Sequence, residues 1–114
     1  MEAPEDLVDQ VYVVLVASAR ERKKLTYKDL AAAVPGVPVR GEKMSAVLRQ
    51  ACRRSHEEKN ILITALVVNS TSGLPSEGFY ELVRELRPDF ETESAADVIA
   101  RREQERAYAE FPRS

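Results

Sequence analysis

The most reactive side chains in the sequence are its single cysteine, Cys52, and its single histidine, His56. A cysteine nucleophile needs an exposed, electropositive setting and a base that generates its thiolate. Cys52 falls on the apolar stripe of a predicted helix, so we expect a small core residue. His56, beside Glu57 and Glu58, has no second histidine or cysteine to share a metal and is expected near the surface of the last helical turn. With no paired-carboxylate or glycine-rich phosphate motif either, the sequence predicts no enzyme, no metal and no cofactor.

Phosphate binding is the chemistry that the charge distribution favours. The net charge is −2, but residues 1–19 carry four acids and no base, residues 20–54 ten bases and three acids, and residues 55–114 seven bases and twelve acids. A central basic block is the local footprint that contact with nucleic-acid phosphates needs. A solvated basic helix face, balanced by acidic neighbours, is an equal alternative.

Length and composition predict one folded domain. The chain has 114 residues, of which 44% are hydrophobic and 32% charged, enough for a single core. We assign residues 1–90 to a main body and residues 91–114 to a C-terminal helical extension of it. The acidic first ten residues do not fit a signal peptide, and no apolar run approaches the roughly 20 residues of a membrane span. A cytoplasmic protein without a membrane partner is therefore expected, and one lone cysteine fits a reducing compartment.

Helical periodicity predicts three helices in the first half of the chain. The first covers about residues 4–22. The second is capped by Thr26, whose hydroxyl is placed to accept from the amide of Asp29, and it ends at the proline and glycine that open a loop at residues 35–41. The third covers residues 42–55, with an apolar stripe on one face and basic side chains on the rest of its surface.

The second half begins with a β-prone run at residues 61–68, predicted to be a buried strand, and a polar turn at 69–73. Helical spacing returns from residue 79 until the proline at 88. A last helix is expected from Ser94, with Asp97 three residues on completing a capping box. Its apolar face is thin, so this helix is either loosely docked or a partner-binding surface. The apolar residues of that face are Ala95, Val98, Ile99 and Tyr108.

This order of helices, strand and turn is that of a winged helix, in which the third helix enters a major groove. The predicted fold class is α+β, mainly α: a winged-helix-like three-helix core with a short strand and turn as the wing, plus C-terminal helices. A three-helix cap on any small α/β domain has the same order.

Three stretches carry a more specific resemblance. They are Leu-Thr-Tyr-Lys-Asp-Leu-Ala at 25–31, Arg-Gly-Glu-Lys-Met-Ser-Ala-Val-Leu at 40–48, and Ile-Leu-Ile at 61–63 followed by Val-Val-Asn-Ser-Thr-Ser-Gly at 67–73. In order and spacing they resemble the DNA-binding domain of O6-alkylguanine-DNA alkyltransferases and alkyltransferase-like proteins. The resemblance spans residues 25 to about 80 and implies a DNA-binding fold.

The chain departs from that family where the family's chemistry is located. Between Ile63 and Val67 it has Thr64-Ala-Leu66 in place of Pro-Cys-His-Arg, so the thiol acceptor, its activating base and the arginine are absent. The resemblance therefore implies DNA binding without alkyl transfer. It also gives Tyr27 and Arg40, by position, a role in holding a nucleotide rotated out of the duplex. The alternatives are a Tyr27 ring packed on the third helix and a solvated Arg40.

Two functions of different classes are compatible with these patterns. The first is a non-catalytic winged-helix-like DNA-binding or regulatory module that contacts double-stranded DNA through helix 42–55 and its preceding loop. Its predicted DNA-binding residues are Tyr27, Lys28, Arg40, Lys43, Arg49 and Arg53. The alternative is a protein-interaction module that docks a partner or a second copy through the C-terminal helix, without nucleic acid. The low pI and the apolar residues Val98, Ile99, Tyr108 and Phe111, which need cover, favour it.

Overall fold

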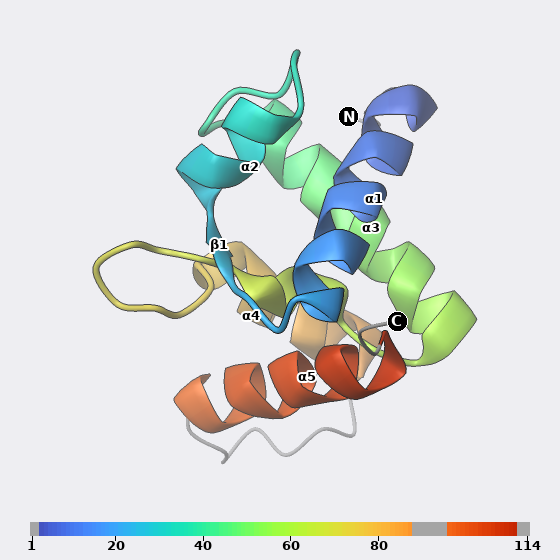
Figure 1. Cartoon of the computed structure of the whole chain (residues 1–114), viewed down its shortest axis with the longest axis vertical. Coiled ribbons are helices and arrows are strands. Elements are labelled where there is room, and N and C mark those ends of the chain that lie inside the picture. Colours follow the sequence, from blue (N-terminus) through green and yellow to red (C-terminus); the bar gives the residue numbers. More distant parts are fainter. Residues whose placement is uncertain (1–2, 88–95, 112–114) are drawn as a thin grey trace.

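The computed structural model describes residues 3–87 and 96–111, and in these residues the protein is mainly helical. Its elements in chain order are α1 (Glu5–Arg20), β1 (Leu25–Thr26), α2 (Tyr27–Ala33), α3 (Glu42–Lys59), the 3-10 helix η1 (Ile63–Leu66), β2 (Val67–Val68), α4 (Glu77–Leu86) and α5 (Ala96–Glu110). Figure 1 shows their arrangement. The helices and the small parallel sheet confirm an α+β fold that is mainly α.

The predicted helices of the first half are confirmed, and α2 has the predicted cap. Thr26 Oγ1 accepts from the Asp29 amide at 3.0 Å, and the Asp29 carboxylate accepts from the Thr26 amide at 3.1 Å. These bonds lower the pKa of Asp29. α3 continues to Lys59, four residues beyond the predicted end at Ser55, because its polar last turn remains helical until Asn60 adopts a left-handed conformation.

The strand predicted at residues 61–68 is wrong for its first six residues. Residues 63–66 form η1, and only Val67 and Val68 pair with β1, in parallel, opposite Leu25 and Thr26 respectively. Because β1 offers only two residues of backbone, the rest of the run bonds elsewhere. Ser55 Oγ donates to the Ile61 carbonyl at 2.8 Å. All eight residues are buried, so their apolar character reflects burial rather than sheet formation.

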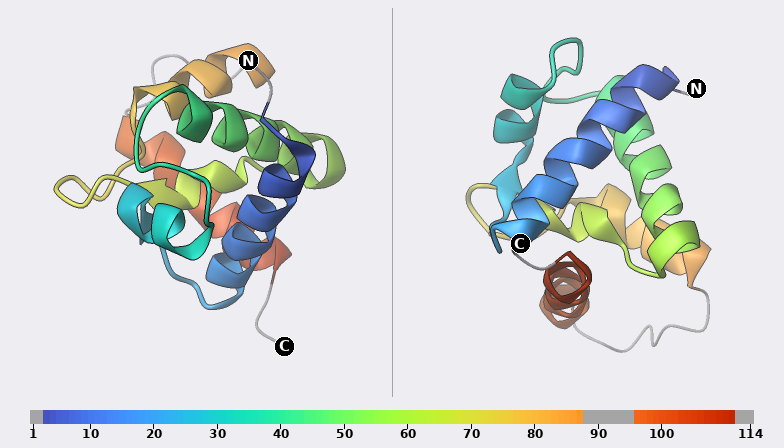
Figure 2. Two further views of the ribbon diagram at one scale, coloured as in Figure 1. Left: turned by 90° about the horizontal axis from the view of Figure 1, so that it is seen from above. Right: turned by 45° about the vertical axis from the view of Figure 1, so that its right-hand side comes forward.

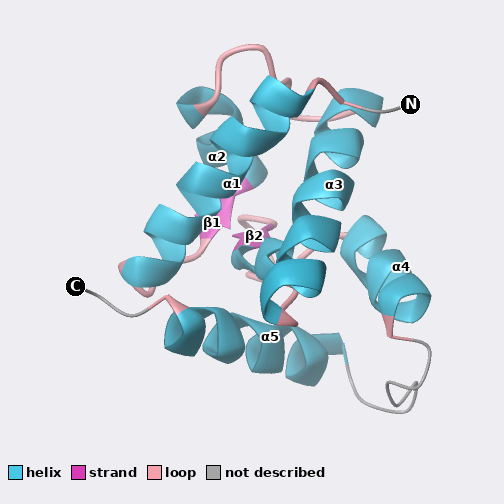
Figure 3. Cartoon of the chain, turned by 90° about the vertical axis from the view of Figure 1, so that its right-hand side faces the viewer, coloured by secondary structure: helices cyan, strands magenta, loops and turns pink. Residues whose placement is uncertain are grey.

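η1 occupies the centre of the molecule. α1 and α3 pack against each other and against η1, and α5 runs along the opposite side of η1, as Figure 2 and Figure 3 show. Two groups of buried side chains surround it. One includes Val11, Leu15, Leu30, Val47, Ile63 and Leu66. The other consists of Cys52, Leu62, Ala65, Phe79, Leu82, Val83 and Ile99.

Cys52 is the core residue that the sequence predicts. It is fully buried, and burial raises the pKa of its thiol to about 11. His56 is half-buried at the end of α3. Cys52 therefore provides no exposed thiolate. The described residues contain no group of three or more histidine, cysteine or acidic side chains placed to hold a metal ion.

The last helix is docked more firmly than its sequence predicts. The predicted start at Ser94 lies outside the described residues, and α5 is described from Ala96. Ile99 and Tyr108 are buried within the chain, so the prediction that they need a partner's cover is wrong; Val98 remains 45% exposed. None of the described helices combines the length and the apolar character that crossing a membrane requires.

Candidate functional site

A pocket of about 540 Å³ lies where three segments distant in sequence meet. These segments are the start of α2, the loop and first turn of α3, and the turn after β2, residues 69–76, which projects from the body in Figure 1. The polar and charged side chains that line it include Tyr27, Lys28, Arg40, Ser45, Asn69 and Ser76. The pocket thus brings together three of the six predicted DNA-binding residues.

The turn that forms one wall is closed by its own backbone. The Asn69 amide donates to the Leu74 carbonyl at 2.9 Å, and the Gly73 amide donates to the Asn69 carbonyl at 2.8 Å. Gly73 has a φ of 70°, a left-handed conformation that glycine adopts without a steric penalty. The wall is therefore a hydrogen-bonded turn anchored at β2.

Tyr27, the first residue of α2, holds this turn against α2 through hydrogen bonds with Ser76. Its hydroxyl accepts from the Ser76 amide at 3.0 Å and lies 2.8 Å from the Ser76 hydroxyl, with either oxygen able to donate in the second contact. Ser76 precedes α4 but makes no side-chain cap for it. The half-buried Tyr27 ring also packs against the main core. A structural role for Tyr27 is therefore established by its contacts.

Two further hollows adjoin the pocket through Ser45, which lines all three. The smaller, about 120 Å³, is also lined by Tyr27, Arg49 and Thr64. Thr64 is 4% exposed, and its buried hydroxyl has no hydrogen-bond partner. The other hollow lies along the exposed side of α3 and is lined by Arg49 and Arg53. The sequence did not single out Ser45 or Thr64.

The predicted cations differ in their surroundings. Arg53 forms an ion pair with Glu85 of α4 at 2.7 Å. Lys28, Arg40 and Arg49 are exposed, and Lys43 is half-buried in the first turn of α3 without lining any of the three hollows. Within the described part of the chain these four form no ion pair. These four side chains therefore carry positive charge without a direct ion-pair partner among the residues described, and Glu81 and Glu42 line the two hollows that Arg49 borders.

The residues that the sequence missed are mainly uncharged. Asn69 and Ser76 belong to the 69–76 turn. They line the pocket because β2, which precedes the turn, pairs with β1, and this pairing between distant segments has no signal in the sequence. An exposed serine in a predicted helix, such as Ser45, carries no signal of its own. No model of a known protein family matches the chain, and neither do the curated proteins or the solved structures compared with it.

Proposed function

We propose that the chain is a non-catalytic, winged-helix-like DNA-binding or regulatory module. In this proposal α3 is the recognition helix, the 69–76 turn is the wing, and the pocket between them faces duplex DNA. The observation that carries the proposal is a group of four cations that form no ion pair among the described residues: Lys28 and Arg40 line the pocket, Arg49 lines the two adjoining hollows, and Lys43 lies in the first turn of α3. Such cations bind phosphates and release counterions from the duplex.

Each residue has a defined task in this proposal. Lys28 and Arg40, from α2 and the loop before α3, contact phosphates on either side of the pocket. Lys43 and Arg49 extend the contact along α3, whereas Arg53 lies beside them with its charge already paired with Glu85 and is not counted as a phosphate contact. The resemblance to alkyltransferase-like proteins adds an extrahelical nucleotide held beside Tyr27. The cytoplasmic location expected from the sequence belongs to the same proposal.

Fluorescence anisotropy with a labelled mixed-sequence duplex tests the proposal. Each phosphate contact contributes about −0.9 to the slope of log affinity against log salt, so four cations predict a slope of about −3.6 between about 50 mM and 200 mM salt. The double variant Lys43→Glu/Arg49→Glu should lose measurable binding at physiological salt. At low salt its slope should be smaller by about 1.8, because two contacts are lost.

The matched control is Lys59→Glu/Arg84→Glu, which changes the net charge by the same amount. Both control positions lie outside the three hollows, and their ion pairs with Glu110 and Glu77 are exposed. The control should retain most of the affinity. Salt-independent binding, equal losses in both variants, or no binding at low salt would refute the proposal, and the last result would favour a protein-contact surface.

A further inference from the structure

α5 holds η1 through two buried polar side chains. The Glu103 carboxylate accepts from the Leu62 amide at 3.0 Å, and the Gln104 side-chain amide donates to the Ala65 carbonyl at 2.9 Å. Glu103 is completely buried and Gln104 nearly so. Because η1 has no side-chain cap of its own, these two contacts satisfy a backbone donor and a backbone acceptor at the two ends of the same short helix.

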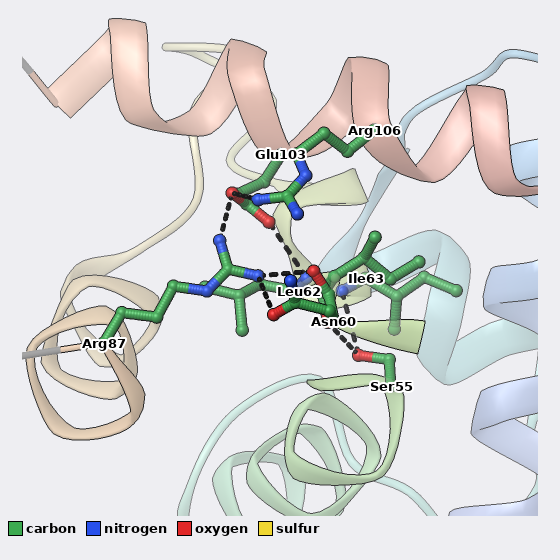
Figure 4. Close-up of polar contacts among 8 residues, drawn as sticks. Ser55, Asn60, Leu62, Ile63, Arg87, Glu103 and Arg106 are labelled. Carbon is green, nitrogen blue, oxygen red and sulfur yellow. Dashed lines mark hydrogen bonds and ion pairs between the residues drawn. The ribbon is translucent and has the colours of Figure 1, made fainter. Parts of the chain in front are cut away.

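The Glu103 carboxylate also accepts hydrogen bonds from two arginines, as Figure 4 shows. Arg87, directly after α4, donates to it at 2.6 Å, and Arg106 of α5 donates at 3.3 Å. Arg87 also donates to the Asn60 carbonyl at 2.7 Å, where α3 ends. The carboxylate therefore lies at the junction of α3, α4, α5 and η1, and its position is determined by all of them.

The opposite side of η1 leads to the candidate site. Thr64, in the middle of η1, lines the 120 Å³ hollow. The chain then continues directly into β2, whose Val68 pairs with Thr26, the residue that caps α2 next to Tyr27. The turn that forms a wall of the pocket follows β2. η1 is therefore connected to both sides of the pocket through β2 and its pairing with β1.

We propose that Glu103 and Gln104 are positioning residues for the candidate site: they fix η1 and, through it, the β2 turn against α2. Neither residue lines the pocket or its adjoining hollows. The effect on duplex binding rests on the proposed function, whereas the effect on the turn does not. Loosening α5 should reduce affinity without removing any of the cations that contact phosphate.

The test compares Gln104→Met and Glu103→Gln with Glu105→Gln, which makes the same chemical change as the second variant at an exposed position of α5. Hydrogen exchange of the Asn69 and Gly73 amides reports closure of the turn. We expect exchange there to accelerate about tenfold in Gln104→Met, the effect of losing roughly one buried hydrogen bond, and by more in Glu103→Gln, which also removes the negative charge opposite Arg87. Affinity for the labelled duplex should fall about tenfold with an unchanged salt slope, and Glu105→Gln should match the wild type.

The outcomes separate positioning from stability and from the proposed function. Unchanged exchange and affinity in folded variants would overturn the inference. Equal acceleration at the turn and at the Leu15 amide of α1 in Gln104→Met would also overturn it, because that indicates global destabilisation. If Glu103→Gln fails to fold by circular dichroism, Gln104→Met, which leaves every ion pair intact, decides alone. If the wild type binds no duplex at low salt, the proposed function fails. Hydrogen exchange then decides the inference alone: faster exchange confined to the turn supports a positioning role for Glu103 and Gln104, and unchanged exchange overturns that role.

Discussion

Truncating Glu103 should destabilise the protein more than any exposed acidic truncation. The Glu103 side chain is 0% exposed and that of its partner Arg87 only 11% exposed, so Glu103→Ala leaves a largely buried guanidinium without a counterion among the described residues. Breaking a buried pair from one side typically costs about 3–5 kcal/mol. Glu103→Ala also leaves the Leu62 amide without its acceptor. The free-energy cost of that lost hydrogen bond is already included in the roughly 3–5 kcal/mol, because both losses come from one carboxylate.

This cost is large against the roughly 5–15 kcal/mol by which a domain is normally stable. Urea denaturation followed by circular dichroism should show a lower midpoint with an unchanged slope, which separates lost stability from a change in the unfolded state. Glu105→Ala is the control, since Glu105 is exposed on the same helix, and its cost should stay within about 0.5 kcal/mol.

A double variant isolates the charge from the packing. Replacing both partners by apolar residues, Glu103→Leu with Arg87→Met, removes the buried charge that each single change leaves behind. Such replacements are often neutral or stabilising, so the double variant should be more stable than Glu103→Leu alone. A cost below about 1 kcal/mol for Glu103→Ala, or a double variant no better than the single one, would refute the assignment of a buried, mutually dependent pair.

Three further predictions concern local contacts. The Cys52 thiol, with its pKa raised to about 11 by burial, should react with a thiol reagent at pH 8 far more slowly in the native protein than in urea; equal rates would contradict the burial. Thr26→Ala should cost about 1 kcal/mol near neutral pH by thermal denaturation. The hydrogen bonds with Thr26 lower the pKa of Asp29 in the folded protein below its ordinary value of 3.8. The stabilisation that ionised Asp29 contributes is therefore present above pH 3.8 and is lost as the pH falls through the lowered pKa of the folded state. The difference in stability between Thr26→Ala and the wild type should accordingly shrink in acid. Tyr27→Phe should lose about 0.5–1.5 kcal/mol through its bond to Ser76, and an unchanged melting temperature would show that this bond contributes nothing net.

The helices and the α2 cap were predictable because their determinants are local. Thr26 and Asp29 are three residues apart, and the capping geometry follows from that spacing alone. The strand at 61–68 was not predictable from its composition. A fully buried apolar run has no periodicity that distinguishes a strand from another buried conformation, and the two-residue length of β1, far away in sequence, limits the pairing.

The candidate site was predictable in its charges but not in its shape. Tyr27, Lys28 and Arg40 were expected together and do line one pocket. The pocket's uncharged wall depends on the contact between Tyr27 and Ser76, which are 49 residues apart. The same holds for α5. Its thin apolar stripe suggested loose docking, whereas it is held by Glu103, a residue type that is rarely buried unless paired.

The pairing of cations determines where positive charge remains available. Arg53 forms an ion pair with Glu85, and Arg54 forms one with Asp9. The Arg54 guanidinium also lies over the Tyr12 ring, and the Arg22 guanidinium lies over the Tyr108 ring.

Each exposed ion pair of this kind contributes at most about 1 kcal/mol to stability, so their main consequence is electrostatic. They neutralise the parts of the basic block that face α1 and α4. Lys28 and Arg40 retain their charge at the 540 Å³ pocket, and Arg49 retains its charge at the adjoining hollows. A chain with a net charge of −2 thereby keeps positive charge at this surface, and the long-range attraction for a polyanion depends on that local field rather than on the net charge.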